Sequence, residues 1–187
     1  MFNKLQRFAK ILFLSSIVTV LATDIYAAAP VQAVADMQGC SDKRVKGSAK
    51  LKERFSEEGV KVVDVTLNMR GLSPGKHAVH IHEAGACEPC GAAGGHFDPG
   101  PDSNTSPDGN HPFHSGDLIN IVVNAGGVGS LHTVTTRVTL SPGPLSLFDA
   151  DGSAIIIHDS PDTYCPEGAE AGCAGGTRAA CGILKLE

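Results

Sequence analysis

The strongest constraint on the fold is an alternation of apolar and polar residues along several short runs. Residues 45–51 read VKGSAKL and residues 60–67 read VKVVDVTL, with many β-branched side chains. Successive side chains of a strand point to opposite faces, so such runs are typical of half-buried strands. No segment beyond residue 29 has the period of an amphipathic helix. The chain is therefore predicted to be all-β, a sandwich or flattened barrel of about eight strands.

Further strands are expected along the rest of the chain. A turn at residues 71–75 precedes a strand that contains His77, His80 and His82, and later strands are predicted at residues 118–123, 132–140, 154–158 and 179–186. Two long segments, residues 85–116 and 160–177, lack periodicity and are rich in glycine, proline and cysteine. Loops of this length in a compact domain are usually functional, so both are expected to contribute to a site.

The first 29 residues have the layout of a secretory signal peptide. Lys4, Arg7 and Lys10 precede an apolar run over residues 11–22, and small residues follow. An uncleaved anchor is the alternative, but the run is shorter than the roughly 20 residues that a spanning helix needs. The predicted organisation is a signal peptide at 1–29, a mature N-terminal segment at 30–44 and one domain at 45–187. An exported protein, periplasmic or extracellular, is expected.

The charge balance argues against polyanionic partners. The formal net charge is −5, and removal of Lys4, Arg7, Lys10 and Asp24 with the signal peptide leaves about −7. An acidic chain without a basic groove is a poor candidate for binding nucleic acid or anionic membrane. No nucleic-acid partner is expected, and no membrane association after cleavage.

Six cysteines lie beyond residue 29, at positions 40, 87, 90, 165, 173 and 181. In an oxidising compartment they indicate disulfides. The Cys87-Glu88-Pro89-Cys90 spacing also occurs in thioredoxin-like redox pairs, but no βαβ pattern surrounds it here.

The histidines are the most informative polar residues. In a strand, His80 and His82 share one face while His77 points to the other. By itself such a pair is usually an ordinary surface feature. Five further histidines stand at positions 96, 111, 114, 132 and 158, most of them beside glycine, proline or an acidic residue. Imidazole suits copper and zinc, and a carboxylate suits zinc, so a histidine site with one aspartate is chemically coherent.

Five motifs together resemble the copper/zinc superoxide dismutase family, in its exported bacterial branch. They occur in the family's order and span the chain from about residue 45 to residue 187: HAVHIHEAGAC, GGHFDPG, HSGDL, DGSAIIIHDSPDTY and GGTRAACGI. The resemblance implies a Greek-key β-barrel with two long functional loops. It also implies two cofactors, a copper ion and a zinc ion, and superoxide, a small anion, as substrate.

The resemblance implies a ligand set for each metal. Copper would be bound by His80, His82, His96 and His158, with His96 bridging to zinc. For zinc, His96, His114 and Asp117 match the family. The middle zinc histidine is expected about eight residues after His96, where the chain reads DSNTS at residues 102–106. His111 is the remaining histidine of this loop, so it is predicted to be the fourth ligand, because a tetrahedral site takes four donors. The alternative is a weak or vacant zinc site.

Three further roles follow from the resemblance. Asp162 matches the carboxylate that hydrogen-bonds ligands of both metals. Arg178 matches the guanidinium at the mouth of the copper channel, where it attracts a small anion. Catalysis would use Arg178 and His96, with His96 accepting a proton and returning it. His77 is expected to hydrogen-bond backbone near the copper ligands, and His132 to be no ligand.

The resemblance also implies a disulfide between Cys181 and the first long loop. Cys87 is favoured as its partner, with Cys90 as the alternative. Cys165 and Cys173 are close enough in sequence to pair locally, and the pairing of Cys40 and Cys90 stays open.

The predicted function is superoxide dismutation to O₂ and H₂O₂ by Cu(II)/Cu(I) cycling. The alternative from another class is a dismutase-like copper-binding protein with little turnover, and a structural β-domain would leave the four histidines and Arg178 unexplained. Exported bacterial members of the family occur as monomers and as homodimers, so the oligomeric state stays open.

Overall fold

The computed structural model describes residues 30–100 and 104–187, and the predicted signal peptide lies outside them. Apart from one short 3₁₀ helix, the regular elements of this part are strands, so the all-β prediction is confirmed. In chain order they are β1 (Gln32–Gly39), β2 (Lys46–Phe55), β3 (Lys61–Arg70), β4 (Gly75–His77), β5 (Val79–His82), η1 (Cys90–Ala93), β6 (Ile121–Val123), β7 (Val128–Thr135), β8 (Ala154–His158), β9 (Arg178–Ile183) and β10 (Lys185–Leu186).

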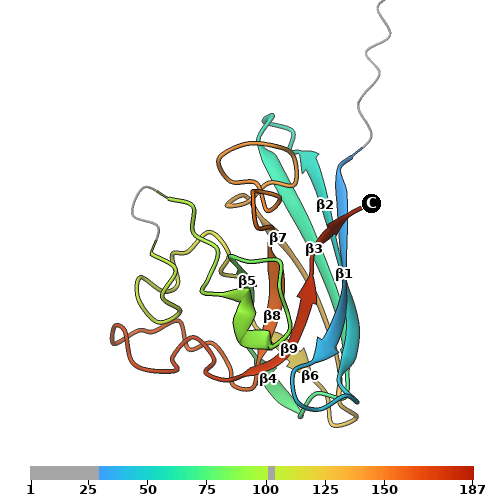
Figure 1. Cartoon of the computed structure of the whole chain (residues 1–187), viewed down its shortest axis with the longest axis vertical. Helices are drawn as coiled ribbons and strands as arrows, with labels where there is room; N and C mark the ends of the chain where they lie inside the picture. The colour runs from blue at the N-terminus through green and yellow to red at the C-terminus, as the bar shows by residue number, and fades with distance from the viewer. Residues whose placement is uncertain (1–29, 101–103) are drawn as a thin grey trace, which may run out of the picture.

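The strands form a nearly closed antiparallel barrel (Figure 1). Their order is β4-β6-β7-β3-β2-β1-β9-β8-β5, and β10 pairs with β1. The two end strands, β4 and β5, are consecutive in the chain and are separated by Ala78 alone. The predicted histidine strand therefore changes partners at Ala78, from β6 to β8. The chain passes from β3 to β4 without pairing these two strands, as a Greek-key barrel requires.

Alternation along the strands fills the barrel with apolar side chains. On β3, Val63, Val65 and Leu67 are fully buried, and they pack with Leu51 of β2 and Ile155 of β8 in one core. Burying each aliphatic side chain of this size contributes roughly 1.5–3 kcal/mol. The outward residues of the same strands are mostly polar, as the sequence pattern predicts.

The structure places a strand within residues 30–44. This segment contains β1, which pairs with β2 along seven residues and also with β9, so the barrel begins ahead of Val45. Ala33, Ala35 and Met37 alternate into the core. The alternation was missed because two of these three side chains are alanines, which give a weak hydrophobic signal.

Both ends of β7 also differ from the prediction. β7 covers Val128–Thr135 rather than residues 132–140, because all eight of its residues pair with β3, from Val63 to Arg70. Val138 and Leu140 are buried without belonging to a strand. An apolar residue in a covering loop gives the same local signal as one in a strand, so the sequence placed this strand too late.

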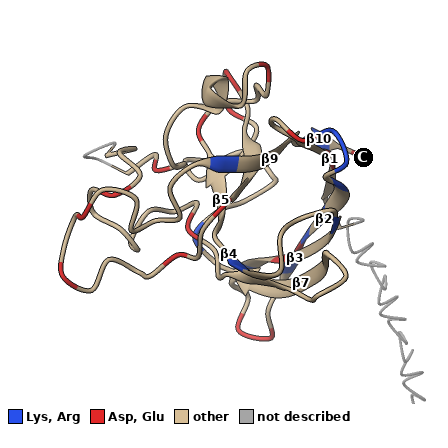
Figure 2. Ribbon diagram, turned by 90° about the horizontal axis from the view of Figure 1, so that it is seen from below, with Lys and Arg blue, Asp and Glu red and all other residues tan. Residues whose placement is uncertain are grey.

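The two long loops, residues 85–116 and 160–177, lie outside the barrel on one side of it (Figures 1 and 2). Both cover the outer face of β5 and β8, which the histidines occupy. Hydrogen bonds join the loops to this face: Ile81 N donates to Gly116 O at 2.8 Å and Ala78 N donates to Ser160 O at 2.9 Å. The barrel thus supplies a rigid wall, and the loops enclose a site against it.

Candidate metal centre

The first histidines of the site come from two paired strands. Val79 and Ile81 of β5 belong to the barrel core, so His80 and His82 face outward. His158 ends the neighbouring strand β8. All three side chains are nevertheless buried, because the two long loops cover them. The alternation of side chains along a strand therefore explains why these imidazoles share one face. The covering loops explain why that face is shielded from solvent.

Four histidines converge there: the ligand nitrogens of His80, His82, His96 and His158 all lie within 4.8 Å of one another. Among the described residues, His80 Nδ1 and the Nε2 atoms of the other three have no hydrogen-bond partner.

In the three strand histidines the opposite ring nitrogen is occupied. His82 Nδ1 donates to Gly94 O at 3.0 Å, His158 Nδ1 donates to Gly176 O at 2.8 Å, and His80 Nε2 donates to Asp162 Oδ2 at 3.2 Å. These contacts leave a lone pair on the nitrogen that faces the cluster. Buried polar atoms are normally paired, so four unpaired nitrogens aimed at one point fit a metal ion.

His96 joins this cluster to a second one around Asp117. His96 Nδ1 lies 2.7 Å from Asp117 Oδ1, on the side of the ring opposite the unpaired Nε2. The nitrogens of His111 and His114 approach the other carboxylate oxygen: each Nδ1 lies near Asp117 Oδ2, at 3.1 and 3.0 Å respectively. One carboxylate and three imidazoles are a donor set that suits zinc.

The predicted zinc residues are thus brought together, including the irregularly spaced His111. The ligand atoms within 4.8 Å of one another belong to His80, His96, His111 and Asp117. His114 takes part through Asp117, and its Nε2 lies 2.7 Å from Gly109 O. Because the backbone carbonyl accepts the Nε2 proton, the Nδ1 lone pair of His114 is directed at the cluster.

Asp162 lies between the two clusters. Its Oδ2 atom is 3.2 Å from His80 Nε2 and 2.7 Å from His111 Nε2, and its Oδ1 accepts a hydrogen bond from Tyr164 N at 2.6 Å. The carboxylate therefore orients one histidine of each cluster. Asn120 holds the backbone of Asp162 on both sides, through Asp162 N at 2.8 Å and Asp162 O at 2.9 Å.

Burial sets the protonation of the first cluster. It lowers the pKa of His80 to about 3 and that of His158 to about 4, and it places the pKa of His82 well below its ordinary value. The cause is desolvation, which disfavours the charged imidazolium. These rings are neutral near pH 7, which is the state that binds metal.

In the second cluster, electrostatic attraction outweighs burial in setting the pKa of His111. Burial alone lowers the pKa of His111, but hydrogen bonds and attraction from Asp117 and Asp162 outweigh it and raise that pKa to about 9. Burial raises the pKa of both carboxyls, yet the histidine hydrogen bonds outweigh this and lower the pKa of Asp117 and of Asp162. At neutral pH both carboxyls are therefore ionised and His111 carries a proton, which a bound metal ion would replace.

Arg178, the first residue of β9, is held beside the first cluster. One guanidinium nitrogen donates to Cys90 O at 2.6 Å and the other donates to Gly94 O. Gly94 O also accepts the hydrogen bond from His82, so the cation and this imidazole share one acceptor. Burial lowers the pKa of Arg178 from its ordinary value, but a guanidinium stays charged at neutral pH.

The six cysteines form three disulfides. Cys87 pairs with Cys181, the partner that the resemblance favoured, and Cys165 pairs with Cys173. The pair left open by the sequence, Cys40 and Cys90, also forms a disulfide. The bonds at Cys87 and Cys90 attach the first loop to β9 and to the segment after β1.

The remaining two histidines lie outside both clusters. His77 Nδ1 is 2.7 Å from His158 O, so this ring supports the backbone of a cluster residue. His132 lies on the exposed face of β7, with Nδ1 3.3 Å from Thr66 Oγ1.

Sequence reasoning missed residues that support the site through backbone contacts. Asn120 holds Asp162, Arg137 donates to the carbonyl oxygen of Asp117, and Asp108 bonds two amides of the second loop. Nothing in the local sequence distinguishes these residues from ordinary polar residues of a loop.

Comparison with known proteins agrees with the arrangement. A family model described as copper/zinc superoxide dismutase matches residues 45–184. A similar solved structure is the crystal structure of the clock protein EA4, which superposes with a TM-score of 0.64 at 26% sequence identity, covering 84% of this chain and 96% of that one. The fold, the motif order and the match over most of the chain lead to one conclusion: this protein belongs to the copper/zinc superoxide dismutase family.

Proposed function

We propose that the protein is a superoxide dismutase that converts two superoxide anions and two protons into O₂ and H₂O₂. His80, His82, His96 and His158 would hold copper, and His96, His111, His114 and Asp117 would hold zinc. The observation that supports this most strongly is the set of four unpaired, buried ring nitrogens within 4.8 Å of one another. Copper, when bound, supplies one-electron oxidation and reduction of superoxide.

Each residue near the site has a role that its contacts support. Arg178 is a fixed cation on a chain with a formal net charge of −5, so it would attract superoxide and donate hydrogen bonds to it. His96 has no hydrogen-bond partner at Nε2 within the described residues, while its Nδ1 contacts Asp117. We assign to His96 Nε2 one of the two protons that H₂O₂ requires, and the second would come from solvent. Asp162 keeps His80 and His111 oriented.

The proposed location is outside the cytoplasm. All six cysteines of the chain are disulfide-bonded, and disulfides persist in oxidising compartments. Residues 30–100 and 104–187 include no helix with the length and apolarity of a membrane span. Together with the predicted signal peptide, the disulfides support a periplasmic or extracellular protein. It would act as a monomer or a homodimer.

A second candidate is a copper-binding protein with little turnover. We retain this candidate because the similar solved structure is named as a clock protein, and that name states no dismutase activity. Metal content and the rate of superoxide decay should be measured on one sample matured under oxidising conditions. We expect copper, zinc and rapid decay of superoxide, whereas copper binding without turnover would select the second candidate.

A matched pair of variants localises the activity. His158→Ala removes a buried member of the first cluster, and His132→Ala removes an exposed histidine of the same barrel. We expect His158→Ala to abolish dismutation while the far-ultraviolet circular dichroism is unchanged, and His132→Ala to keep wild-type turnover. A copper-loaded His158→Ala protein with wild-type turnover would show that the site is assigned wrongly.

A further inference from the structure

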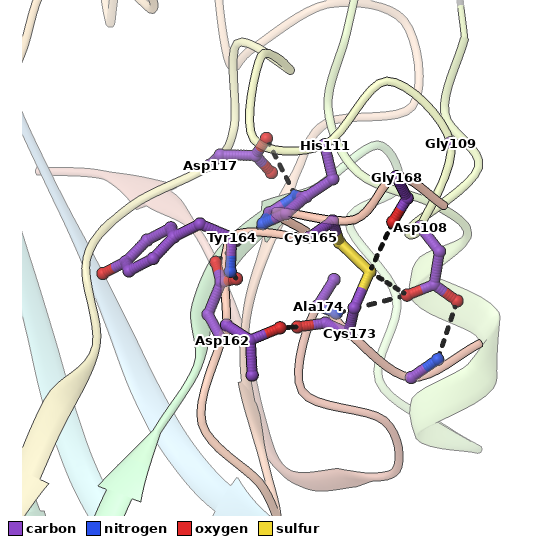
Figure 3. Close-up of a disulfide and its surroundings, with 12 residues drawn as sticks. Asp108, Gly109, His111, Asp117, Asp162, Tyr164, Cys165, Gly168, Cys173 and Ala174 are labelled. Atoms are coloured by element: carbon purple, nitrogen blue, oxygen red, sulfur yellow. Dashed lines mark hydrogen bonds and ion pairs between the residues drawn. A yellow bond between two sulfur atoms is a disulfide. The ribbon is translucent and has the colours of Figure 1, made fainter. Parts of the chain in front are cut away.

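Besides the Asp162–His111 contact, the carboxylate of Asp108 also joins the two long loops. Asp108, in the first loop, accepts a hydrogen bond from Gly172 N at 3.0 Å and another from Ala174 N at 3.2 Å, both in the second loop (Figure 3). Each of its oxygens thus takes one backbone amide. Asp108 is half-buried, which strengthens such bonds relative to those of a fully solvated carboxylate.

The segment bound by Asp108, residues 165–173, is closed into a ring by a disulfide. The Cys165–Cys173 disulfide links its ends, and Cys173 Sγ lies 3.6 Å from Asp108 Oδ1 (Figure 3). Within the segment, Gly168 N donates to Cys165 O and Cys173 N donates to Glu170 O, each at 3.0 Å. Because the disulfide restricts this segment, fixing one end of it also fixes the other.

The closed segment continues directly into the residue that orients the histidines. Thr163 donates to Cys173 O through its backbone N at 2.9 Å and through its Oγ1 at 3.1 Å, and Asp162 forms a β-bridge with Ala174. Residues 173 and 174 are therefore held by Asp108 on one side and by the Asp162–Thr163 backbone on the other. The Asp108 carboxylate and the backbone of Asp162 are thus bonded to the same short stretch of chain.

The first loop is constrained at the same place. Asp108 precedes a tight turn that leads to His111, and Gly109 O, the carbonyl after Asp108, is 2.7 Å from His114 Nε2. In the described residues, the non-glycine positions with left-handed backbone are Asn110 (φ 65°), Tyr164 (φ 63°) and Cys165 (φ 45°), all of them in this region. Such conformations are unfavourable for residues other than glycine and persist where surrounding contacts enforce them.

We propose that Asp108 is a positioning residue: by fastening the disulfide-closed segment 165–173 to the first loop, it keeps Asp162 against His111 and thereby preorganises the zinc site. The inference rests on the proposed function, since it takes His111 as a zinc ligand. The partners of Asp108 are backbone amides, so its proposed effect on zinc passes through Asp162 and His111. Outer contacts of this kind typically change metal affinity by about 10–100-fold.

The test measures zinc affinity of the metal-free, disulfide-bonded protein by competition with a chelator. Asp108→Ala removes both acceptors, and Asp108→Asn keeps one acceptor oxygen. Glu167→Ala is the matched control, since it removes an exposed carboxylate from the same segment and no side-chain hydrogen bond of Glu167 is present in the described structure. We expect zinc affinity to fall about tenfold in Asp108→Ala, less in Asp108→Asn, and not measurably in Glu167→Ala.

A second readout separates positioning from a general loss of stability. Hydrogen exchange in the metal-free protein should show the amides of Gly172 and Ala174 losing protection in Asp108→Ala, while the β2 and β3 amides keep theirs. In a Cys165→Ser/Cys173→Ser background, Asp108→Ala should lower zinc affinity less than it does alone, because the two constraints act on one segment.

The outcomes distinguish this inference from the proposed function. If the wild-type protein takes up no zinc, the proposed zinc site and this inference both fall. If the wild type binds zinc and Asp108→Ala exposes the two amides without changing zinc affinity, Asp108 holds the loops together but does not position the ligands, and the inference alone is overturned.

Discussion

Asp162 Oδ2 lies 2.7 Å from His111 Nε2, so a carboxylate of the second long loop is held against a histidine of the first. The other ring nitrogen of His111 is 3.1 Å from Asp117 Oδ2. His111 thus occupies the place between two carboxylates even though its spacing from His96 departs from the family pattern. The chain between these two histidines provides the length and the turn residues that this requires, including Pro107 and Gly109.

His111→Ala should lower zinc content to well below one ion per chain while copper binding by the other histidines is largely kept. A ligand present at 100 times its Kd stabilises a protein by about 2.7 kcal/mol, and this zinc-dependent increment should shrink in the variant. Metal analysis and thermal unfolding with and without zinc measure both effects. One tightly bound zinc ion with unchanged stability would show that another group completes the site.

Substitutions of Arg178 should separate charge from packing. Arg178→Glu should lower the rate of dismutation at least about tenfold, since steering by a local charge changes association rates by factors of 10 to 1000. Arg178→Lys should keep the charge but lose one of the two carbonyl contacts, with a smaller decrease. Rates measured at low and high ionic strength test this, because the difference between the variants should narrow as salt increases. Equal rates in all three proteins would place Arg178 outside the channel.

Removal of the Cys40–Cys90 disulfide should affect stability and Arg178 together. The bond spans 50 residues of sequence, and loss of such a cross-link typically costs about 2–4 kcal/mol. Cys90 O also accepts a hydrogen bond from Arg178. Cys40→Ser/Cys90→Ser should therefore unfold at lower denaturant concentration and bind small anions such as azide more weakly in the copper-loaded form.

The comparison for this prediction is Cys165→Ser/Cys173→Ser, which removes a cross-link that spans 8 residues and has no contact with Arg178. It should lower zinc affinity rather than anion affinity. If the two double variants weaken anion binding equally, the effect is a general one of lost disulfides and does not pass through Arg178.

The metal-free protein should lose stability on the acid side below pH 6.5. The pKa of His80 is lowered to about 3 and that of His158 to about 4 in the folded state, mainly by burial. The unfolded chain, in which histidine has a pKa of about 6.5, therefore binds more protons as the pH falls from 6.5 towards 4. His111 acts in the opposite sense: its pKa is raised to about 9, so its contribution is full below pH 6.5 and is lost as the pH rises through 9.

Denaturant unfolding of the metal-free protein between pH 4 and pH 9 measures these slopes. In His158→Ala the loss of stability between pH 6.5 and pH 4 should be smaller, and in His111→Ala the loss between pH 6.5 and pH 9 should be smaller. If His158→Ala loses as much stability between pH 6.5 and pH 4 as the wild type does, the assignment of a buried neutral imidazole is contradicted.

The strand alternation was sufficient to predict an all-β fold, because burial of every second residue is a local property of a strand. The same local rule placed His80 and His82 on one face, and the family resemblance indicated His96 and His158 as the residues that join them. It did not reveal β1, whose alanines signal burial weakly, and it placed β7 too late, because Val138 and Leu140 are buried by a loop rather than by a strand.

Only the tertiary structure decided how the loops close over the histidine face. The contact of His111 with Asp162 joins positions 51 residues apart, the Cys40–Cys90 bond joins positions 50 apart, and the Asp108 contacts join positions 64 and 66 apart. No periodicity encodes such pairs, since each depends on where two irregular segments meet after the barrel has formed. The sequence by itself therefore determined the barrel and the family, and the resemblance predicted individual ligands. The folded loops determined that Cys40 meets Cys90 and that Asp108 meets the second loop.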